Sequence, residues 1–131
     1  MPPALQQLHH LGIATANISE ATAFVRRAFA VTGQDGPMFD PKLNVEVVLL
    51  FVKDSAAIEL VSGAPVSGVL KRRVLLYHCC YEVESLEAQL SRLKDDGALI
   101  VVPPTPAVLF NGRRVAFVHT KIGLMELLEA E

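Results

Sequence analysis

Hydrophobic and polar residues alternate along the chain in a way that predicts two amphipathic helices. The first is expected from Asn17 to about Val31, where Asn17 and Glu20 have the spacing of a capping box. Its apolar residues recur at intervals of three and four, at Ala21, Phe24, Val25, Ala28 and Phe29. The second is expected to begin after Ser85 and to end before Gly97. Its apolar stripe consists of Leu86, Leu90 and Leu93.

Short apolar or β-branched segments outside these helices predict strands. They cover residues 7–16, 44–52, 56–61, 74–83, 99–102, 113–119 and 123–128. A loop is expected at residues 33–41, which are rich in Gly, Pro and Asp, and prolines at 103–106 are expected to end the strand before them. Residues 68–73 favour a short helix. Each half then has the order β, α and three strands, of which the first of the three is the least marked.

The chain contains an internal repeat. Residues 8–18 and 76–86 are both an apolar strand that carries one histidine and leads into a polar helix cap, and His78 follows His10 by 68 positions. Glu59 and Glu126 each lie inside an apolar strand, 67 positions apart. Self-similarity at a fixed offset indicates a duplicated unit. We therefore expect one domain over residues 1–131, made of two halves at about 7–67 and 74–130.

Composition narrows the classes of protein that the chain can represent. Its 131 residues suit one domain with a real core, and a hydrophobic content of 51% favours a buried subunit interface, hence a homodimer. The net charge of −2 argues against a nucleic-acid partner. The longest apolar run, residues 47–52, is too short to cross a membrane, and no secretory signal pattern is evident. Cys79 and Cys80 are adjacent, which is unfavourable for a disulfide, so we expect a cytoplasmic protein with reduced thiols.

Several blocks of the sequence resemble the vicinal oxygen chelate superfamily, which includes glyoxalase I, methylmalonyl-CoA epimerase, extradiol dioxygenases and the bleomycin and fosfomycin resistance proteins. The similarity covers essentially the whole chain and is greatest to the epimerase and to glyoxalase I. It is carried by the segments LHHLGIA (8–14), YH (77–78), GRRVAFVH (112–119) and LMEL (124–127). This resemblance implies an α+β fold in which tandem βαβββ modules form a cup-shaped mixed sheet around a divalent metal ion.

The resemblance also implies four metal ligands, because His10, Glu59, His78 and Glu126 match the ligand positions of the superfamily. Physical chemistry supports the same residues, since an ionised carboxylate within an apolar strand is costly unless it is paired or bound to a metal. Two imidazoles and two carboxylates suit Ni, Co, Mn, Fe or Zn. The alternative is that each Glu lies at a solvated sheet edge and each His is an ordinary core residue.

Such a site predicts a metal-dependent isomerase or lyase that stabilises the enolate of a small carbonyl or thioester substrate. Glu126, Glu59 and Glu46 are the candidates for the catalytic base. Two alternatives are an Fe(II) extradiol-type dioxygenase and a metal-free ligand-binding or resistance protein.

Other polar residues have less defined roles. His9 should face away from His10, because neighbouring side chains alternate along a strand. His119 and Cys80 are further residues that a ligand or a metal could contact. The basic clusters at 71–73 and 113–114 could hold a phosphate or carboxylate, or could simply be solvated. Residues 103–110 could form a rigid flap over the cup or pack on a dimer partner.

Overall fold

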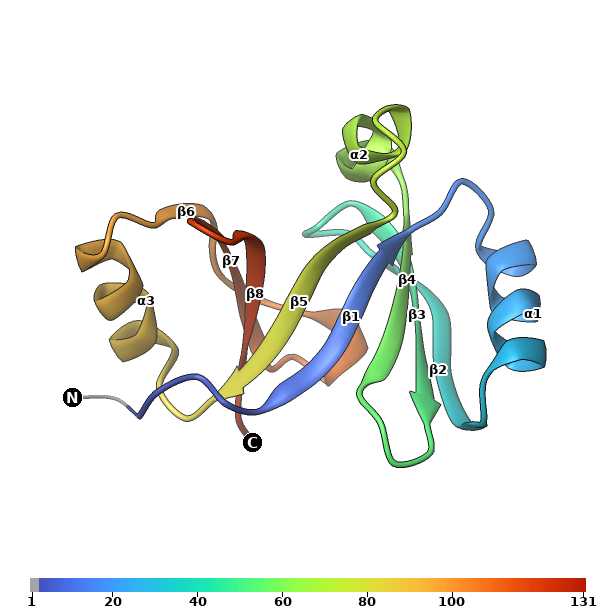
Figure 1. Cartoon of the computed structure of the whole chain (residues 1–131), viewed down its shortest axis with the longest axis horizontal. Helices are drawn as coiled ribbons and strands as arrows, with labels where there is room; N and C mark the ends of the chain where they lie inside the picture. Colours follow the sequence, from blue (N-terminus) through green and yellow to red (C-terminus); the bar gives the residue numbers. More distant parts are fainter. Residues whose placement is uncertain (1–2) are drawn as a thin grey trace.

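A computed structural model describes residues 3–131 of the chain (Figure 1). Both predicted amphipathic helices are present, and each begins at the expected cap, where Asn17 and Ser85 accept a backbone N–H three residues on. The elements in order are β1 (Leu8–Ala14), α1 (Ile18–Ala28), β2 (Val31–Asp40), β3 (Val45–Val52), β4 (Ala57–Ser62), η1 (Ala64–Val66), α2 (Ser67–Lys71), β5 (Leu76–Val83), α3 (Leu86–Asp95), β6 (Leu99–Pro106), η2 (Val108–Phe110), β7 (Arg114–Thr120) and β8 (Gly123–Glu129).

All the strands belong to one sheet in the order β2-β3-β4-β1-β5-β8-β7-β6. Within each half the first strand pairs in parallel with the last, β1 with β4 and β5 with β8. The halves join through the antiparallel pair of β1 and β5, and Figure 1 shows α1 and α3 at opposite ends of the curved sheet. The predicted α+β fold of tandem βαβββ modules is confirmed.

The expected loop at residues 33–41 is wrong, because β2 runs through most of it. β2 pairs with β3 on both sides of a register shift between Asp35 and Met38. Similarly, the prolines at 103–106 do not end β6, which continues to Pro106. Both are edge strands of the sheet. An edge strand tolerates proline because some of its N–H groups need no partner strand.

Apolar side chains form a core on each face of the sheet. On the outer face, α1 packs on β3 and β4, and α3 packs on β7 and β8. The opposite face, which we call the inner face, carries a cluster drawn from both halves. Its buried members are Ala14, Val45, Val47, Leu49, Ala57, Val61, Val66, Cys80, Ala107, Leu109, Phe110, Val115 and Leu128. The two halves therefore share one core, and this core holds the inner face of one half against that of the other.

Asp40 attaches the η2 segment to the inner face. Its buried carboxylate accepts hydrogen bonds from the backbone N–H groups of Lys42, Leu43 and Val108. Leu109 and Phe110 are consequently buried against their own chain. The two alternatives for residues 103–110 were a flap over the cup and packing on a dimer partner. The contacts of Leu109 and Phe110 support the flap. Within residues 3–131, no helix is long and apolar enough to cross a membrane.

Candidate metal centre

Two histidines and two glutamates converge at the centre of the inner face. His10 lies on β1, Glu59 on β4, His78 on β5 and Glu126 on β8, which are the four central strands of the sheet. All four side chains are buried, and one ligand atom of each lies within 4.8 Å of the others. The four residues predicted from the sequence are therefore brought together, and we call them the tetrad.

The register of the strands explains this convergence. In one row across the sheet, His10 pairs with Cys80 and Cys80 with Glu126. In the next row, Glu59 pairs with Gly12 and Gly12 with His78. In each row, a small residue lies between the two ligands: Cys80 in the first row and Gly12 in the second. These two small residues are themselves 68 positions apart, as the repeat requires.

The position of Gly12 has no room for a side chain. A Cβ atom at this position would overlap the His78 ring, because the imidazole lies directly over the glycine. At the equivalent place in the second half, the thiol of Cys80 is fully buried beside His10. Both cysteines are free, as expected.

The geometry of the tetrad suits a single cation. The Nε2 atom of His10 lies 2.9 Å from Glu126 Oε1 and 3.4 Å from Glu59 Oε1. The Nε2 atom of His78 lies 3.1 Å and 3.4 Å from the same two oxygens. Ligands that bind one ion at about 2.1 Å and at right angles are separated by about 3 Å. The four atoms therefore already have the spacing of neighbouring ligands around one ion.

His78 gives a second indication of a cation. Both of its ring nitrogens are buried, and neither has a hydrogen-bond partner among the described residues, although Nε2 is close to two carboxylates. Buried polar atoms are rarely left without a partner. An ion bound between the four side chains would satisfy the Nε2 atom.

Without a metal, the tetrad is a buried cluster of opposite charges. Burial alone would lower the pKa of His78, but the Glu126 and Glu59 carboxylates outweigh it and raise the pKa to about 9. Burial likewise opposes protonation of His10, while the charge of Glu59 and its hydrogen-bonding neighbours raise its pKa. For Glu59, burial would raise the pKa, but His10 and His78 lower it to about 2. The metal-free site thus holds protonated imidazoles beside ionised carboxylates.

His9 lies beside the tetrad, so the prediction that it faces away from His10 is wrong. Leu8 pairs with Tyr81 and His10 with Cys80, so His9 is the extra residue of a β-bulge. The bulge changes the alternation of side chains, and His9 Nδ1 lies 2.8 Å from His10 Nδ1. Metal-binding histidines usually hydrogen-bond through the ring nitrogen that does not face the metal. His9 is placed to hold the His10 ring in this way, and Phe110 stacks on the same ring.

A cavity of about 190 Å³ opens beside the tetrad. Glu59 and Glu126 form its polar wall, together with Asp40 and Tyr77. Its other walls are apolar or proline residues, and no Lys or Arg among residues 3–131 contributes to them. They consist of Leu43, Val45, Val47, Val61, Pro65, Val66, Val101, Val102, Ala107, Leu109, Phe110, Phe117 and Leu124.

Comparison with known proteins agrees with this geometry. A family profile described as the Glyoxalase/Bleomycin resistance protein/Dioxygenase superfamily matches residues 9–117. The chain belongs to this superfamily. Members of the glyoxalase superfamily bind divalent metal ions, and the tetrad is a possible site for one. The family resemblance inferred from the sequence is therefore confirmed.

Two proteins with sequences similar to this chain are named as epimerases. The ethylmalonyl-CoA/methylmalonyl-CoA epimerase of Cereibacter sphaeroides is 30% identical over 88% of this chain and 89% of its own. The mitochondrial methylmalonyl-CoA epimerase of Dictyostelium discoideum is 29% identical over 95% and 77% of the two chains. The crystal structure of methylmalonyl-CoA epimerase from Mycobacterium tuberculosis has a TM-score of 0.80 at 22% identity, over 97% and 89% of the chains. The first two relatives confirm the expected kinship to isomerases of the superfamily, and the crystal structure shows that the fold is shared.

Glu46 is a correction to the predicted site. It lies on β3 between Val45 and Val47, which line the cavity, so strand alternation turns its exposed side chain to the opposite face. There it borders Ser62 and the start of α1. Glu46 is therefore not placed to act on a ligand in the cavity. His119 is also exposed, and it does not line the cavity.

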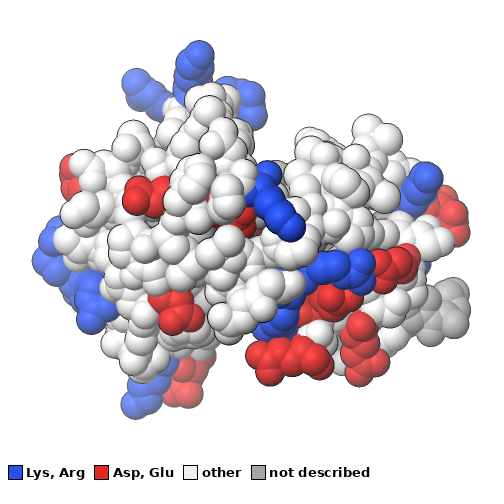
Figure 2. All heavy atoms as spheres, turned by 180° about the vertical axis from the view of Figure 1, so that it is seen from behind, with Lys and Arg blue, Asp and Glu red and all other residues white. Residues whose placement is uncertain are grey.

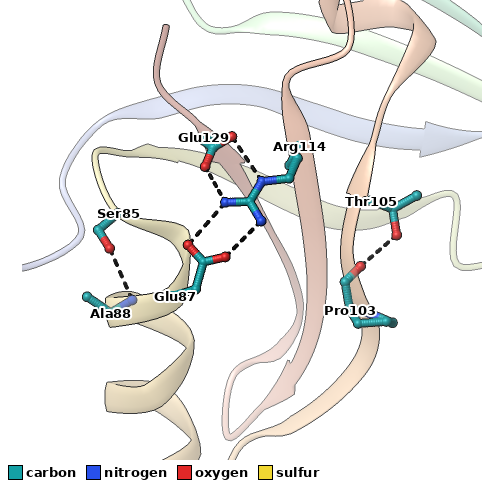
Figure 3. A network of polar contacts seen from close by, with 7 residues as sticks. All are labelled: Ser85, Glu87, Ala88, Pro103, Thr105, Arg114 and Glu129. Carbon is teal, nitrogen blue, oxygen red and sulfur yellow. Dashed lines mark hydrogen bonds and ion pairs between the residues drawn. The ribbon is translucent and has the colours of Figure 1, made fainter.

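The basic cluster of Arg113 and Arg114 is engaged in holding the second half together. Arg113 donates hydrogen bonds to the Glu82 carboxylate and to the Glu129 carbonyl. Figure 3 shows the Arg114 guanidinium between the carboxylates of Glu129 and Glu87. These two arginines are consequently not free to hold a ligand.

A glycine variant tests how the tetrad is assembled. We expect Gly12→Ala to reduce affinity for Ni²⁺ or Co²⁺ at least about tenfold, because the added methyl group displaces the His78 ring while leaving all four ligands in the sequence. Isothermal titration calorimetry of the metal-free protein measures this. Gly68→Ala is the matched control, since its Cβ would meet only the end of the Arg72 side chain at 3.6 Å. Unchanged metal affinity in Gly12→Ala would contradict the packing described.

The charges of the tetrad predict that the stability of the metal-free protein depends on pH. Because the pKa of His78 rises from 6.5 to about 9 on folding, its contribution to stability is complete below pH 6.5 and is lost as the pH rises through 9. We expect the free energy of unfolding in urea to fall by about 3 kcal/mol between pH 6.5 and 9.5. The free energy of unfolding of the metal-loaded protein, whose histidines are already deprotonated, should fall much less over the same pH range. A metal-free protein that is equally stable or more stable at pH 9.5 would contradict the account.

Proposed function

We propose that this chain is a metal-dependent epimerase of a 2-substituted malonyl thioester of coenzyme A. The observation that carries the proposal is the buried tetrad of two imidazoles and two carboxylates, of which the two carboxylates line an apolar cavity. The names of the two relatives, which are methylmalonyl-CoA or ethylmalonyl-CoA/methylmalonyl-CoA epimerases, support the choice of substrate.

His10, Glu59, His78 and Glu126 would hold the metal ion. Held by these residues, a divalent ion of the Ni, Co, Mn, Fe or Zn group would supply Lewis-acid stabilisation of the negative charge of an enolate. The chain itself must supply the groups that move the proton. Within the cavity, the described residues offer three carboxylates for this purpose: Asp40, Glu59 and Glu126.

We propose that two of these carboxylates carry out the acid–base chemistry. Both oxygens of Asp40 already accept backbone hydrogen bonds, so Asp40 has a structural role. Glu59 and Glu126 come from strands on opposite sides of the central β1–β5 pair. Inversion of a stereocentre through a planar enolate requires removal of a proton from one face and its return to the other. We propose that one of the two glutamates removes the proton and the other returns it.

Tyr77 is a further residue that we place in the mechanism. Its ring lies edge-on against His78, with 4.5 Å between the ring centroids, and it lines the cavity. Burial raises the pKa of Tyr77, and the charges of Glu59 and Glu126 raise it further. The phenol therefore stays protonated and can donate a hydrogen bond to a substrate oxygen on which negative charge develops.

The shape and polarity of the cavity support a small alkyl substituent on the substrate. Aliphatic and aromatic side chains would surround a methyl or ethyl group and keep water from the enolate. An extradiol dioxygenase would use two histidines and one carboxylate, whereas this site has two carboxylates. A protein that only sequesters a ligand has no need of the tetrad. The homodimer and the cytoplasmic location stay predictions.

Glutamine variants separate metal binding from proton transfer. We expect wild-type protein loaded with Co²⁺ to invert a single stereoisomer of methylmalonyl-CoA or ethylmalonyl-CoA in D₂O and to incorporate deuterium. Glu59→Gln and Glu126→Gln keep an oxygen ligand but lose a base, so inversion should fall at least about 100-fold in each. Each variant keeps the base on one face, so each should still exchange the proton of one stereoisomer without inverting it, and the stereoisomer should differ between the two variants.

Chiral chromatography and NMR follow inversion and exchange separately. Glu46→Gln is the control, because its side chain is exposed on the other face of β3, and it should retain full activity. The proposal fails if metal-loaded wild type neither exchanges nor inverts either thioester. It also fails if Glu46→Gln is as inactive as the tetrad variants.

A further inference from the structure

Three consecutive cations at the end of α2, Lys71, Arg72 and Arg73, have no role in the site described so far. All three side chains are exposed, and no carboxylate of residues 3–131 lies within ion-pair distance of them. The sequence from Leu60 to Tyr81 contains no acidic residue at all. We call these residues the α2 cations.

The α2 cations stand apart from the rest of the charged surface. Figure 1 shows α2 projecting from one end of the sheet. Figure 2, which views the molecule from behind, shows a group of blue side chains at that end with no red surface adjoining it. In contrast, Arg113 and Arg114 lie among carboxylates. Of the two basic clusters in the sequence, only the α2 cations are free to bind an anion.

The α2 cations lie at the rim of the cavity. Pro65 and Val66, which lead directly into α2, line the cavity, and Val69 and Leu70 pack on the inner-face core. Since α2 rises about 1.5 Å per residue, Lys71 is within about 8 Å of Val66 along the helix. The apolar side of α2 thus forms part of the cavity wall, while its basic end faces solvent.

An apolar strip connects the α2 cations to the tetrad. Val74, Leu75 and Leu76 follow Arg73 and are 47%, 50% and 54% exposed. The next residue, Tyr77, lines the cavity and lies against His78. Arg73 lies in a turn with a φ of 59°, and the four residue steps from it to Tyr77 span at most about 13 Å. A ligand held by the α2 cations would therefore run over apolar surface into the cavity.

We propose that the α2 cations bind the phosphate groups of coenzyme A and so anchor the thioester whose acyl end enters the cavity. This inference rests on the proposed function. It gives a binding site to the charged phosphate groups of the substrate, which the apolar cavity cannot hold. The pantetheine arm joins the thioester to the diphosphate through roughly a dozen bonds, about as many as four extended residues. Guanidinium groups bind phosphate oxygens in pairs, which suits Arg72 and Arg73.

Binding of adenosine 3′,5′-bisphosphate tests the anchor without any chemistry at the tetrad. We expect Lys71→Gln/Arg72→Gln/Arg73→Gln to bind this probe at least tenfold more weakly than wild type by isothermal titration calorimetry. The control is Arg27→Gln/Lys53→Gln/Lys94→Gln, which removes the same charge from exposed positions elsewhere and should bind like wild type. Urea unfolding verifies that both triple variants fold. The single variant Arg72→Gln should lose less affinity for the bisphosphate than the α2 triple variant.

Kinetics with two thioesters tests the same anchor in the reaction. We expect the α2 triple variant to raise KM for the coenzyme A thioester at least tenfold, with kcat changed by less than twofold. The corresponding pantetheine thioester, which has no phosphate, should show the same KM with both proteins.

The outcomes separate this inference from the proposed function. Equal affinity of the α2 and control variants for the bisphosphate overturns the anchor, whether or not the protein is an epimerase. A wild type that uses the pantetheine thioester as well as the coenzyme A thioester overturns it also. Loss of bisphosphate binding in the α2 variant, together with an inactive metal-loaded wild type, supports the anchor and refutes the epimerase.

Discussion

The burial of two carboxylates between two imidazoles, at the centre of an apolar sheet, is the interaction on which the rest of the structure depends. Ionised groups are costly in such surroundings unless each has a partner of opposite charge. Glu59 and Glu126 obtain their partners from His10 and His78 only when β1, β4, β5 and β8 pair in one register. Gly12 makes room for one imidazole, and the bulge at His9 brings a hydrogen-bond partner to the other. A shift in any central strand would leave a buried charge unpaired.

Duplication explains why this arrangement suits the inversion of a stereocentre. Each half contributes one histidine from its first strand and one glutamate from its last. The antiparallel β1–β5 pair then places the two halves around a common centre, with the carboxylates on its two sides. The halves differ in what surrounds this centre, since the α2 cations and the η2 cover each occur once. Under the proposed function, the symmetric part would supply the chemistry, and the asymmetric parts would shape the access of the substrate to it.

Much of this could be predicted from the sequence, because the deciding patterns are local or repeated. The caps at Asn17 and Ser85, the central strands and the four tetrad residues follow from periodicity, repeat and family resemblance. The edge strand β2 and the second half of β6 were missed because their Gly and Pro content resembles that of loops, and pairing with a neighbour decides their structure. His9 and Glu46 were misjudged for a related reason. The face that a strand residue occupies depends on bulges and cross-strand register, which a single sequence does not show.

The cavity and its surroundings lie further from what sequence can predict. Residues from β3, β4, β6, β7, η1 and η2 line it, and nothing in their local pattern connects them. Likewise, the sequence contains two similar basic clusters, and only the contacts of the folded chain distinguish Arg113 and Arg114 from the α2 cations.

Metal content tests the central claim most directly. Elemental analysis of wild-type protein purified without chelator, beside His78→Ala prepared in the same way, measures how many divalent ions each chain holds. We predict about one ion per chain in the wild type and a small fraction of that in the variant, because the tetrad has the ligands of one site. A folded wild type that contains no ion and takes up none of Ni, Co, Mn, Fe or Zn on addition would contradict the account.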